Sequence, residues 1–244
     1  MFQEFTPYGT VHAAALLVPV FSGLLFTFFA LKKPDFQKAI GISYAVLILT
    51  VRFARYGMDM ALGTFHIAQL LSVQICHVNM FLLAFCLVRP NRGLFAFNFI
   101  AGIPTALAVV LFPGTVHRPP ATARAAFFIA SHVLLVMGAL HLQLVHRFRI
   151  PWRTVLYLHA LPLVVFPPLY FINSVFGANA LYLMGGNPGT VLETMYDALG
   201  PIWYLAVIIV LYWLCLDLMY LVHRLFLRVA ERRTKTGGEA CERA

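Results

Sequence analysis

The sequence predicts an all-α, polytopic membrane protein with seven transmembrane helices. Three observations lead to this class: 61% of the residues are hydrophobic, 11% are charged, and the apolar residues form long runs. A soluble domain is about half apolar and about a quarter charged, whereas a membrane-crossing helix needs about 20 mostly apolar residues. The surplus of apolar residues in segments of that length favours one integral membrane domain.

The expected helices follow one another along most of the chain. Their ranges are His12–Leu31, Ala39–Met58, His66–Val88, Gly93–Pro113, Ala125–Val145, Thr154–Phe176 and Pro201–Arg224. Residues 1–224 would then form the membrane domain, and residues 225–244 a basic, flexible cytoplasmic tail. Pro162, Pro167 and Pro168 predict a kink or a break in the sixth helix, because each proline removes a backbone donor.

The distribution of Lys and Arg predicts the orientation of these helices. With the C-terminus in the cytoplasm and the N-terminus outside, 14 of the 18 basic residues lie in cytoplasmic segments. The outer side keeps Arg52, Arg55, Arg118 and Arg124. This is the positive-inside pattern of membrane proteins. The net charge of +9 therefore indicates topology, and no nucleic-acid partner is expected.

Other sequence features exclude several classes of function. The four cysteines have no metal-ligand or disulfide-framework spacing, so no metal and no cofactor are expected. Residues 1–8 lack the basic start of a secretory signal, and no internal repeat favours an inverted-repeat transporter. The seventh helix has no Lys for a retinal Schiff base. The sequence indicates no protein partner.

The third helix carries the residues around which a site is expected, namely Gln74, Cys76, His77 and Asn79. Polar groups at membrane depth are costly and usually face a partner or a cavity. Cys76 lies ten residues, or about 15 Å, from His66, and His132 lies about 10 Å from Ala125. A thiol with a nearby imidazole is the pattern of a nucleophile and its base. The alternative is a buried Cys that only packs and a His that satisfies a helix carbonyl.

Further polar residues fall at the same predicted depth in the outer half of the bilayer. Arg52 and Arg55 lie on one helix face, where a guanidinium could hold a phosphate; their alternative is to reach the outer headgroups. Other candidate substrate-binding residues at this level are His12, Asn173 and Asn179. Toward the cytoplasmic side we expect Asp217 to pair with His159 or an arginine, and His141 lies in the same region.

Several motifs taken in order resemble the YwaF-like family of bacterial integral membrane proteins, over roughly residues 5–221. The N-terminal Phe5-Thr6-Pro7 with His12 is similar to the start of that family. The segment Leu71–Cys76 resembles its Leu-Pro-Leu-His-Leu-Cys motif, with Gln74 in place of His and Ser72 in place of Pro. Further similar segments are Phe127–His132, Asn173–Met184 and Gly200–Tyr204, and Asn187-Pro188 stands where the family often has Lys-Pro.

The resemblance implies a lipid enzyme, because the wider superfamily includes an animal transmembrane cysteine acyltransferase of ether-phospholipid synthesis and more distant lipid hydrolases. Cys76 would then be the acyl-accepting nucleophile and His132 the base, with His77 and Gln74 as possible support. We also expect Arg52, Asn173 and Asn179 to shape the headgroup or oxyanion region, and the kinked sixth helix is a second source of oxyanion donors.

The leading prediction is therefore an acyltransferase or transacylase that acts on membrane phospholipids through an acyl thioester, or a related membrane lipid hydrolase, in a bacterial inner membrane. Two other classes stay open. One is a non-catalytic membrane protein that binds a lipid or small molecule through Arg52, His132 and Gln74. The other is a transporter, which would need a polar path from the outer residues to Asp217.

Overall fold

The computed structural model describes residues 5–6, 8–65, 74–111, 121–186 and 190–242, and within these ranges it is helical with no β-strand. The main helices are α1 (Thr10–Lys32), α2 (Gln37–Ala61), α4 (Ile75–Val88), α5 (Arg92–Phe97), α6 (Ile103–Leu111), α7 (Ala121–His146), α8 (Trp152–Phe176) and α9 (Val191–Glu242). Short one-turn segments are η1 (Pro34–Phe36) and η3 (Ala180–Tyr182), and the π-helix η2 (Asn98–Gly102) joins α5 to α6.

Six helical segments in the described part of the chain are long and apolar enough to cross a membrane. They correspond to the expected first, second, fourth, fifth, sixth and seventh helices. The all-helical membrane class is therefore confirmed at this level. The orientation of the helices, with the N-terminus outside, stays a prediction.

The expected third helix is shorter than predicted. The helix α4 begins at Ile75, and Gln74 before it has an extended backbone (φ −109°, ψ 155°). The expected start at His66 and the motif residues Leu71 to Val73 lie outside the described residues. Fourteen residues make a helix of about 21 Å, which is shorter than a hydrocarbon core of about 30 Å. The start of α4 therefore lies within the depth of the bundle, and Cys76 is in its first turn.

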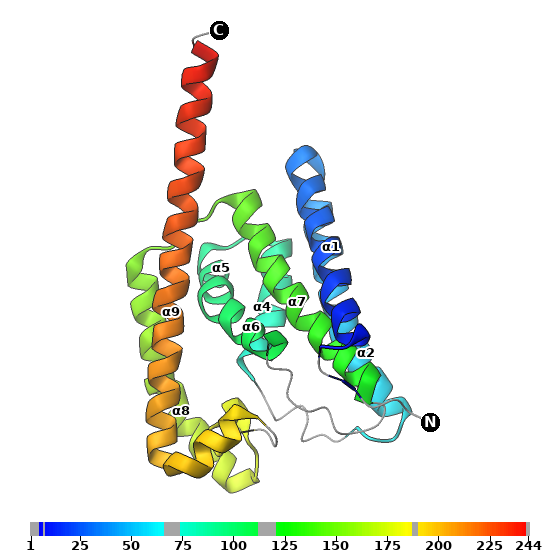
Figure 1. Ribbon diagram of the computed structural model, residues 1–244, viewed down its shortest axis with the longest axis vertical. Helices are drawn as coiled ribbons and strands as arrows, with labels where there is room; N and C mark the ends of the chain where they lie inside the picture. The colour runs from blue at the N-terminus through cyan, green and yellow to red at the C-terminus, as the bar shows by residue number, and fades with distance from the viewer. Residues whose placement is uncertain (1–4, 7, 66–73, 112–120, 187–189, 243–244) are drawn as a thin grey trace.

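The helix α7 is the centre of the bundle. Two thirds of its most apolar stretch (67%) is buried, compared with 28% for α1 and α2. Figure 1 shows α7 crossing the middle of the molecule, with α1 and α2 on one side and α4, α5 and α6 on the other. Polar side chains placed on the inner faces of α2, α4 and α7 consequently meet one another instead of lipid.

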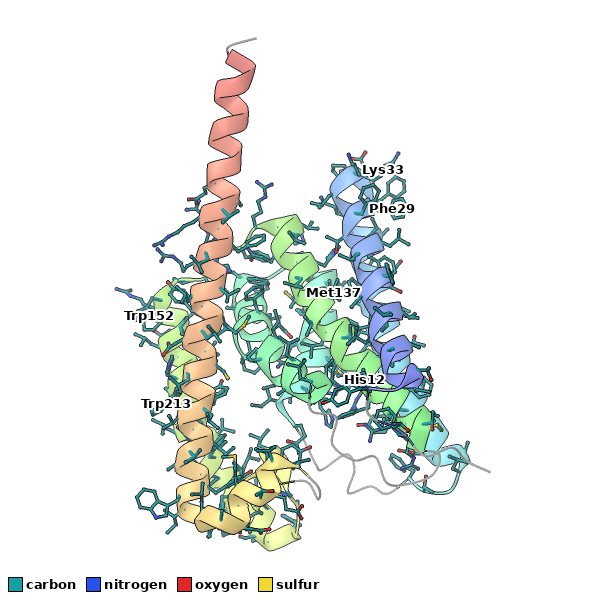
Figure 2. All side chains as sticks on the ribbon, in the orientation of Figure 1. His12, Phe29, Lys33, Met137, Trp152 and Trp213 are labelled. Atoms are coloured by element: carbon teal, nitrogen blue, oxygen red, sulfur yellow. The ribbon has the colours of Figure 1, made fainter. Side chains whose placement is uncertain are left out.

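The helices α8 and α9 form the periphery on the other side, where 17% and 11% of their most apolar stretches are buried. Figure 1 shows them side by side, and the end of α9 extends beyond the rest of the protein. Trp213 of α9 donates its indole N–H to the carbonyl oxygen of His159 of α8 at 2.9 Å, and Figure 2 shows Trp213 with Trp152 in this peripheral pair. The helix α8 is continuous through Pro162, Pro167 and Pro168, so the predicted break is absent, and the alternative of a kink stays a prediction.

The helix α9 changes direction at its Gly-Pro step. Gly200 has a positive φ of 70°, which favours glycine, and Pro201 suits the first turn of the helix that follows. This agrees with the predicted start at Pro201, whereas the helical arm from Val191 to this step was not predicted. The helix then continues to Glu242. The separation of a tail at residues 225–244 stays a prediction, although its backbone is helical through Glu242.

Candidate functional site

The register between α2, α4 and α7 determines which polar residues meet. A Cβ on Gly138 would lie 2.9 Å from Leu83 and 3.5 Å from Ile48, so these three residues form one layer of the bundle. Arg52 is four residues from this layer along α2, Cys76 is seven residues along α4, and His132 is six residues along α7. At 1.5 Å per residue, these positions lie about 6, 10 and 9 Å from the layer.

All three positions lie on the same side of that layer because α2 runs antiparallel to α4 and α7. A second contact confirms the register of α2 and α4: a Cβ on Gly41 would collide with the carbonyl oxygen of Leu87. Arg52 is eleven residues from Gly41, and Cys76 is eleven residues from Leu87. Eleven residues are about three helical turns, so each pair occupies one helix face. The structure therefore brings Arg52, Cys76 and His132 to a common depth.

Cys76 is 7% exposed and lies at the positive end of a helix dipole. No side chain among the described residues caps this helix end. The charge of Arg52 and the backbone N–H groups of His77 and Cys76 all act on the sulfur. These groups stabilise negative charge at that position, whereas burial opposes it. The first turn of α4 can therefore stabilise the oxyanion of an attacked ester.

His132 is fully buried, and its hydrogen bonding leaves one ring nitrogen available. Its Nδ1–H donates to the carbonyl oxygen of Phe128 at 2.6 Å, because a carbonyl can only accept. Nε2 is then a lone-pair acceptor, and it is buried with no partner among the described residues. An imidazole held in this tautomer can act as a base toward a proton that reaches Nε2.

Arg52 connects the groups of this site. It is 4% exposed, and its guanidinium lies 4.7 Å from the centre of the Tyr56 ring. Its charge acts on Cys76, His77 and His132. His77 and His132 also act on each other. The described hydrogen bonds include none between the Cys76 sulfur and the His132 ring, so proton transfer requires a substrate, a water or a small side-chain movement.

Four residues predicted for this site have other surroundings. His12 accepts a hydrogen bond from the Tyr8 N–H at 3.3 Å and stacks on the Tyr8 ring, at the end of α1 that Figure 2 labels. Asn173 and Asn179 bond the backbone of residues 180–185, at Ala180, Met184 and Gly185. Gln74 donates to the Asn179 carbonyl at 3.3 Å. These contacts give structural roles, and their assignment to substrate binding or catalytic support stays a prediction.

Two features of the site were missed by sequence reasoning. The first is an ion pair at 2.8 Å between Arg124 Nη2 and Asp59 Oδ1, whose side chains are 5% and 2% exposed. The only available signal was that both residues fall at the same predicted end of the helices. The second is an apolar cavity of about 160 Å³. It is lined by Ile75, Val78, Phe97, Leu161, Pro162, Val165, Phe166, Leu169, Leu181 and Tyr212.

The position of this cavity matters because Ile75 and Val78 flank Cys76 in the sequence. They lie three residues apart and so share a face of α4. The opposite wall comes from α8 and α9, and Leu181 adds the loop that Gln74 bonds. An apolar space thus begins at the turn of α4 that carries the Cys76 thiol.

These features define a polytopic α-helical membrane protein with a buried cysteine at a helix N-terminus, close to buried arginine and histidine. A family model matches residues 7–220, and the chain belongs to the TMEM164 family. This match does not support the predicted YwaF-like name, and the bacterial inner membrane stays a prediction. Comparison with curated proteins and with solved structures gave no match.

Proposed function

We propose that this protein transfers acyl groups between membrane lipids through a thioester on Cys76. The observation that carries the proposal is the placement of the Cys76 sulfur in the first turn of α4, at the same depth as Arg52 and as a histidine whose Nε2 has no partner among the described residues. A nucleophile, a group that stabilises negative charge and a base are the parts that acyl transfer requires. The Lys and Arg distribution predicts that this end of the bundle faces away from the cytoplasm.

The reaction divides into two displacement steps. In the first, the Cys76 sulfur attacks the carbonyl carbon of a lipid ester while His132 Nε2 accepts the thiol proton. The tetrahedral oxyanion lies at the positive end of α4, and its collapse breaks the ester C–O bond. His132 returns the proton to the departing alkoxide, which leaves as an alcohol, and the acyl group stays on sulfur.

In the second step, the hydroxyl or amino group of an acceptor lipid attacks the thioester carbonyl. His132 takes the proton of the acceptor, and the sulfur leaves as a thiolate that recovers a proton from His132. The products are a new ester or amide and the free thiol. The apolar cavity beside Ile75 and Val78 would hold the acyl chain during both steps.

The oxyanion donors differ from those that the sequence predicted. Proline removes a backbone N–H and leaves a carbonyl without its partner, so the prolines of α8 supply acceptors and no additional donors. The amide of Asn173 already bonds Ala180 through both its oxygen and its nitrogen. The backbone N–H of Cys76 lies in the first turn of α4 and is better placed, whereas the N–H of His77 already donates to the Gln74 carbonyl at 2.9 Å.

An assay of acyl transfer by the full chain reconstituted in lipid vesicles tests this proposal. Cys76→Ala is expected to abolish transfer while the protein remains folded. Cys86→Ala is the matched control because Cys86 is also a buried cysteine of α4, and its sulfur contacts the Asn91 carbonyl at 3.5 Å. Its activity should equal that of the wild type. Full transfer by Cys76→Ala would reject the proposal.

A non-catalytic lipid-binding protein is the second candidate, and the buried arginines favour it independently of the thiol. Its signature would be phospholipid that copurifies unaltered with both wild type and Cys76→Ala. In that case the lipid composition of the vesicles would also stay constant over time. Loss of a lipid substrate with wild type alone would exclude this second candidate.

A further inference from the structure

A group of charged side chains, three of them buried and one half-buried, extends from the site toward the end of the bundle. We call Arg52, Arg55, Asp59 and Arg124 the arginine cluster. The first three lie on the last turns of α2, and Arg124 lies on the first turn of α7. Arg124 pairs with Asp59, Arg52 lies over the Tyr56 ring, and Arg55 lies 5.3 Å from the centre of the Phe128 ring.

The arginine cluster contains three positive charges and one negative charge, and two of the positive charges have no counterion in the part of the chain that the structure describes. The opposite charge that acts on Arg55 comes from Asp59, while Arg52 and Arg124 act on it as like charges. The partners of Arg52 are Tyr56 and Cys76, and neither is a carboxylate. Burying unpaired charge is unfavourable by several kcal/mol per ion, so a partner of opposite charge is expected.

The chain segments next to the cluster in sequence do not supply that partner. Residues 66–73 follow α2 after a few residues, and residues 112–120 precede α7. Neither segment contains Asp or Glu. The side chains of Arg52 and Arg124 are each 4% exposed, so their guanidinium groups do not extend into water at the level of the lipid headgroups. The counterion must therefore come from outside these parts of the chain.

The geometry of the unpaired donors indicates the chemistry of this counterion. The Nε atoms of Arg52 and Arg124 are buried and have no partner among the described residues. Arg52 carries its donors on a planar fork that matches two oxygens of a phosphate. We propose that the arginine cluster binds a phosphate group, with Arg52 and Arg55 as its principal ligands and Arg124 held in place by Asp59.

The depth of the cluster fits the phosphate of a membrane lipid. The span that includes η1 and α2, Pro34–Ala61, has 28 residues, or about 42 Å of helix, so its ends extend past a hydrocarbon core of about 30 Å. Asp59 then lies near the headgroups, and Arg52 lies about two turns deeper. Because Arg52 also acts on Cys76, a phosphate held there would bring the ester groups of the same lipid toward the sulfur. This assignment to a lipid substrate rests on the proposed function.

The test measures ligand binding separately from catalysis. Full-length Cys76→Ser protein in detergent is titrated with dioleoyl phosphatidic acid, dioleoylglycerol and inorganic phosphate, and thermal stability is recorded. Phosphatidic acid should raise the melting temperature, whereas dioleoylglycerol, which lacks only the phosphate, should not. Arg52→Gln should weaken phosphatidic acid binding by about tenfold or more, because a charge-assisted bond is lost. Arg153→Gln, an exposed arginine outside the cluster, should bind like the parent.

Arg55→Gln keeps the test decisive if Arg52→Gln fails to fold. Without lipid it should melt at the same or a higher temperature, since it removes repulsion between like charges. With phosphatidic acid its gain in melting temperature should be smaller than that of the parent. A lower lipid-free melting temperature combined with unchanged affinity would overturn the proposal, and so would equal stabilisation by dioleoylglycerol.

The inorganic phosphate arm distinguishes the two sources of phosphate. Weak, competitive binding by inorganic phosphate supports a lipid source, because the acyl chains then add affinity. If inorganic phosphate binds as tightly as phosphatidic acid, the proposal of a lipid ligand is overturned and the cluster is a site for free phosphate. If phosphate binding depends on Arg52 but wild-type protein transfers no acyl group, the proposed function fails while the phosphate site stands.

Discussion

The two ends of α7 carry buried polar residues of very different character. Near its start, Arg124 belongs to the arginine cluster, and His132 follows with an Nε2 that no described residue contacts by a hydrogen bond. Near its end, His141 Nδ1 lies 3.1 Å from the Thr27 hydroxyl. Seventeen residues, or about 26 Å of helix, separate Arg124 from His141. The same helix thus joins an end with excess charge to an end whose histidine is paired.

The end that contains His141 shows how this chain stabilises a polar group in a membrane when no ligand is required. His159 Nε2 lies 3.3 Å from Asp217 and its Nδ1 donates to the Val155 carbonyl, which confirms the predicted pairing. His223 Nε2 accepts from the Ile150 N–H at 3.1 Å. Because local pairs are available to this fold, the excess positive charge around Arg52 requires another explanation, and we attribute it to an anionic substrate.

The largest expected effect on activity comes from replacing His132 of α7 by alanine, and replacing His141 of the same helix gives the comparison. His132→Ala should lower the rate of acyl transfer by about 10²–10⁴-fold, because it removes the general base. His141→Ala should keep the transfer rate and cost about 1 kcal/mol of stability, since it loses its contact with Thr27. Vesicle transfer assays and thermal melts of both variants make the comparison. Equal losses of activity would mean that neither histidine acts as a base.

Breaking the buried ion pair should have the largest effect on stability. Asp59→Asn leaves Arg124 without its carboxylate in a site where both side chains are almost fully buried. The expected loss is about 3–5 kcal/mol, because an uncompensated buried charge remains. Chemical unfolding in detergent measures it. The double variant Asp59→Leu, Arg124→Met should be less destabilised than the single one, and the opposite order would contradict the role of the pair.

Filling the apolar cavity should change the selectivity for acyl chains. Val165→Trp places a large side chain in the cavity wall and should slow transfer of long acyl chains about tenfold, while short chains are affected less. Val164→Trp is the matched control, because Val164 is 70% exposed on the outer face of α8. Competition assays with mixed chain lengths measure the ratio. If the ratio of long-chain to short-chain transfer is unchanged in Val165→Trp, the cavity does not hold the acyl chain.

The smallest effect is expected for the ion pair between His159 of α8 and Asp217 of α9. Asp217 has a side chain that is 50% exposed, and its contact with His159 is 3.3 Å long. Asp217→Asn should change stability by less than about 1 kcal/mol, because Asn can still donate a hydrogen bond to His159 Nε2 and removes a carboxylate from a membrane-spanning helix, and it should leave transfer unaffected. The same unfolding experiment used for Asp59→Asn measures it. A transport role would instead be supported if solute uptake were lost with this variant.

The membrane spans and the depth of the main site residues could be predicted from the sequence. Long apolar runs mark spans regardless of packing, and counting residues from their ends placed Arg52, Cys76 and His132 at similar levels. The start of α4 could not be predicted, because Leu71, Val73 and Ile75 continue the apolar run across the point where the helix begins.

Side-chain partners were the other limit of sequence reasoning. Asn173 and Asn179 look like ligand-binding amides in sequence, but hydrogen bonds to the backbone of a loop depend on a conformation that composition does not specify. The pairing of Arg124 with Asp59 depends on the packing of α2 beside α7, because the two residues are 65 positions apart in the sequence. Proline was misleading in α8, because a helix can continue through it in a membrane where neighbouring groups satisfy the freed carbonyls.

The most direct test of the central claim is intact-protein mass spectrometry after incubation with phospholipid vesicles. Wild-type protein should gain a mass equal to one acyl chain, and hydroxylamine should remove it, because a thioester is cleaved by this nucleophile. Cys76→Ala should gain no such mass, and Cys86→Ala should behave like wild type. An acyl adduct of the same size on Cys76→Ala, or lipid remodelling by that variant at the wild-type rate, would contradict the assignment of Cys76 as the nucleophile.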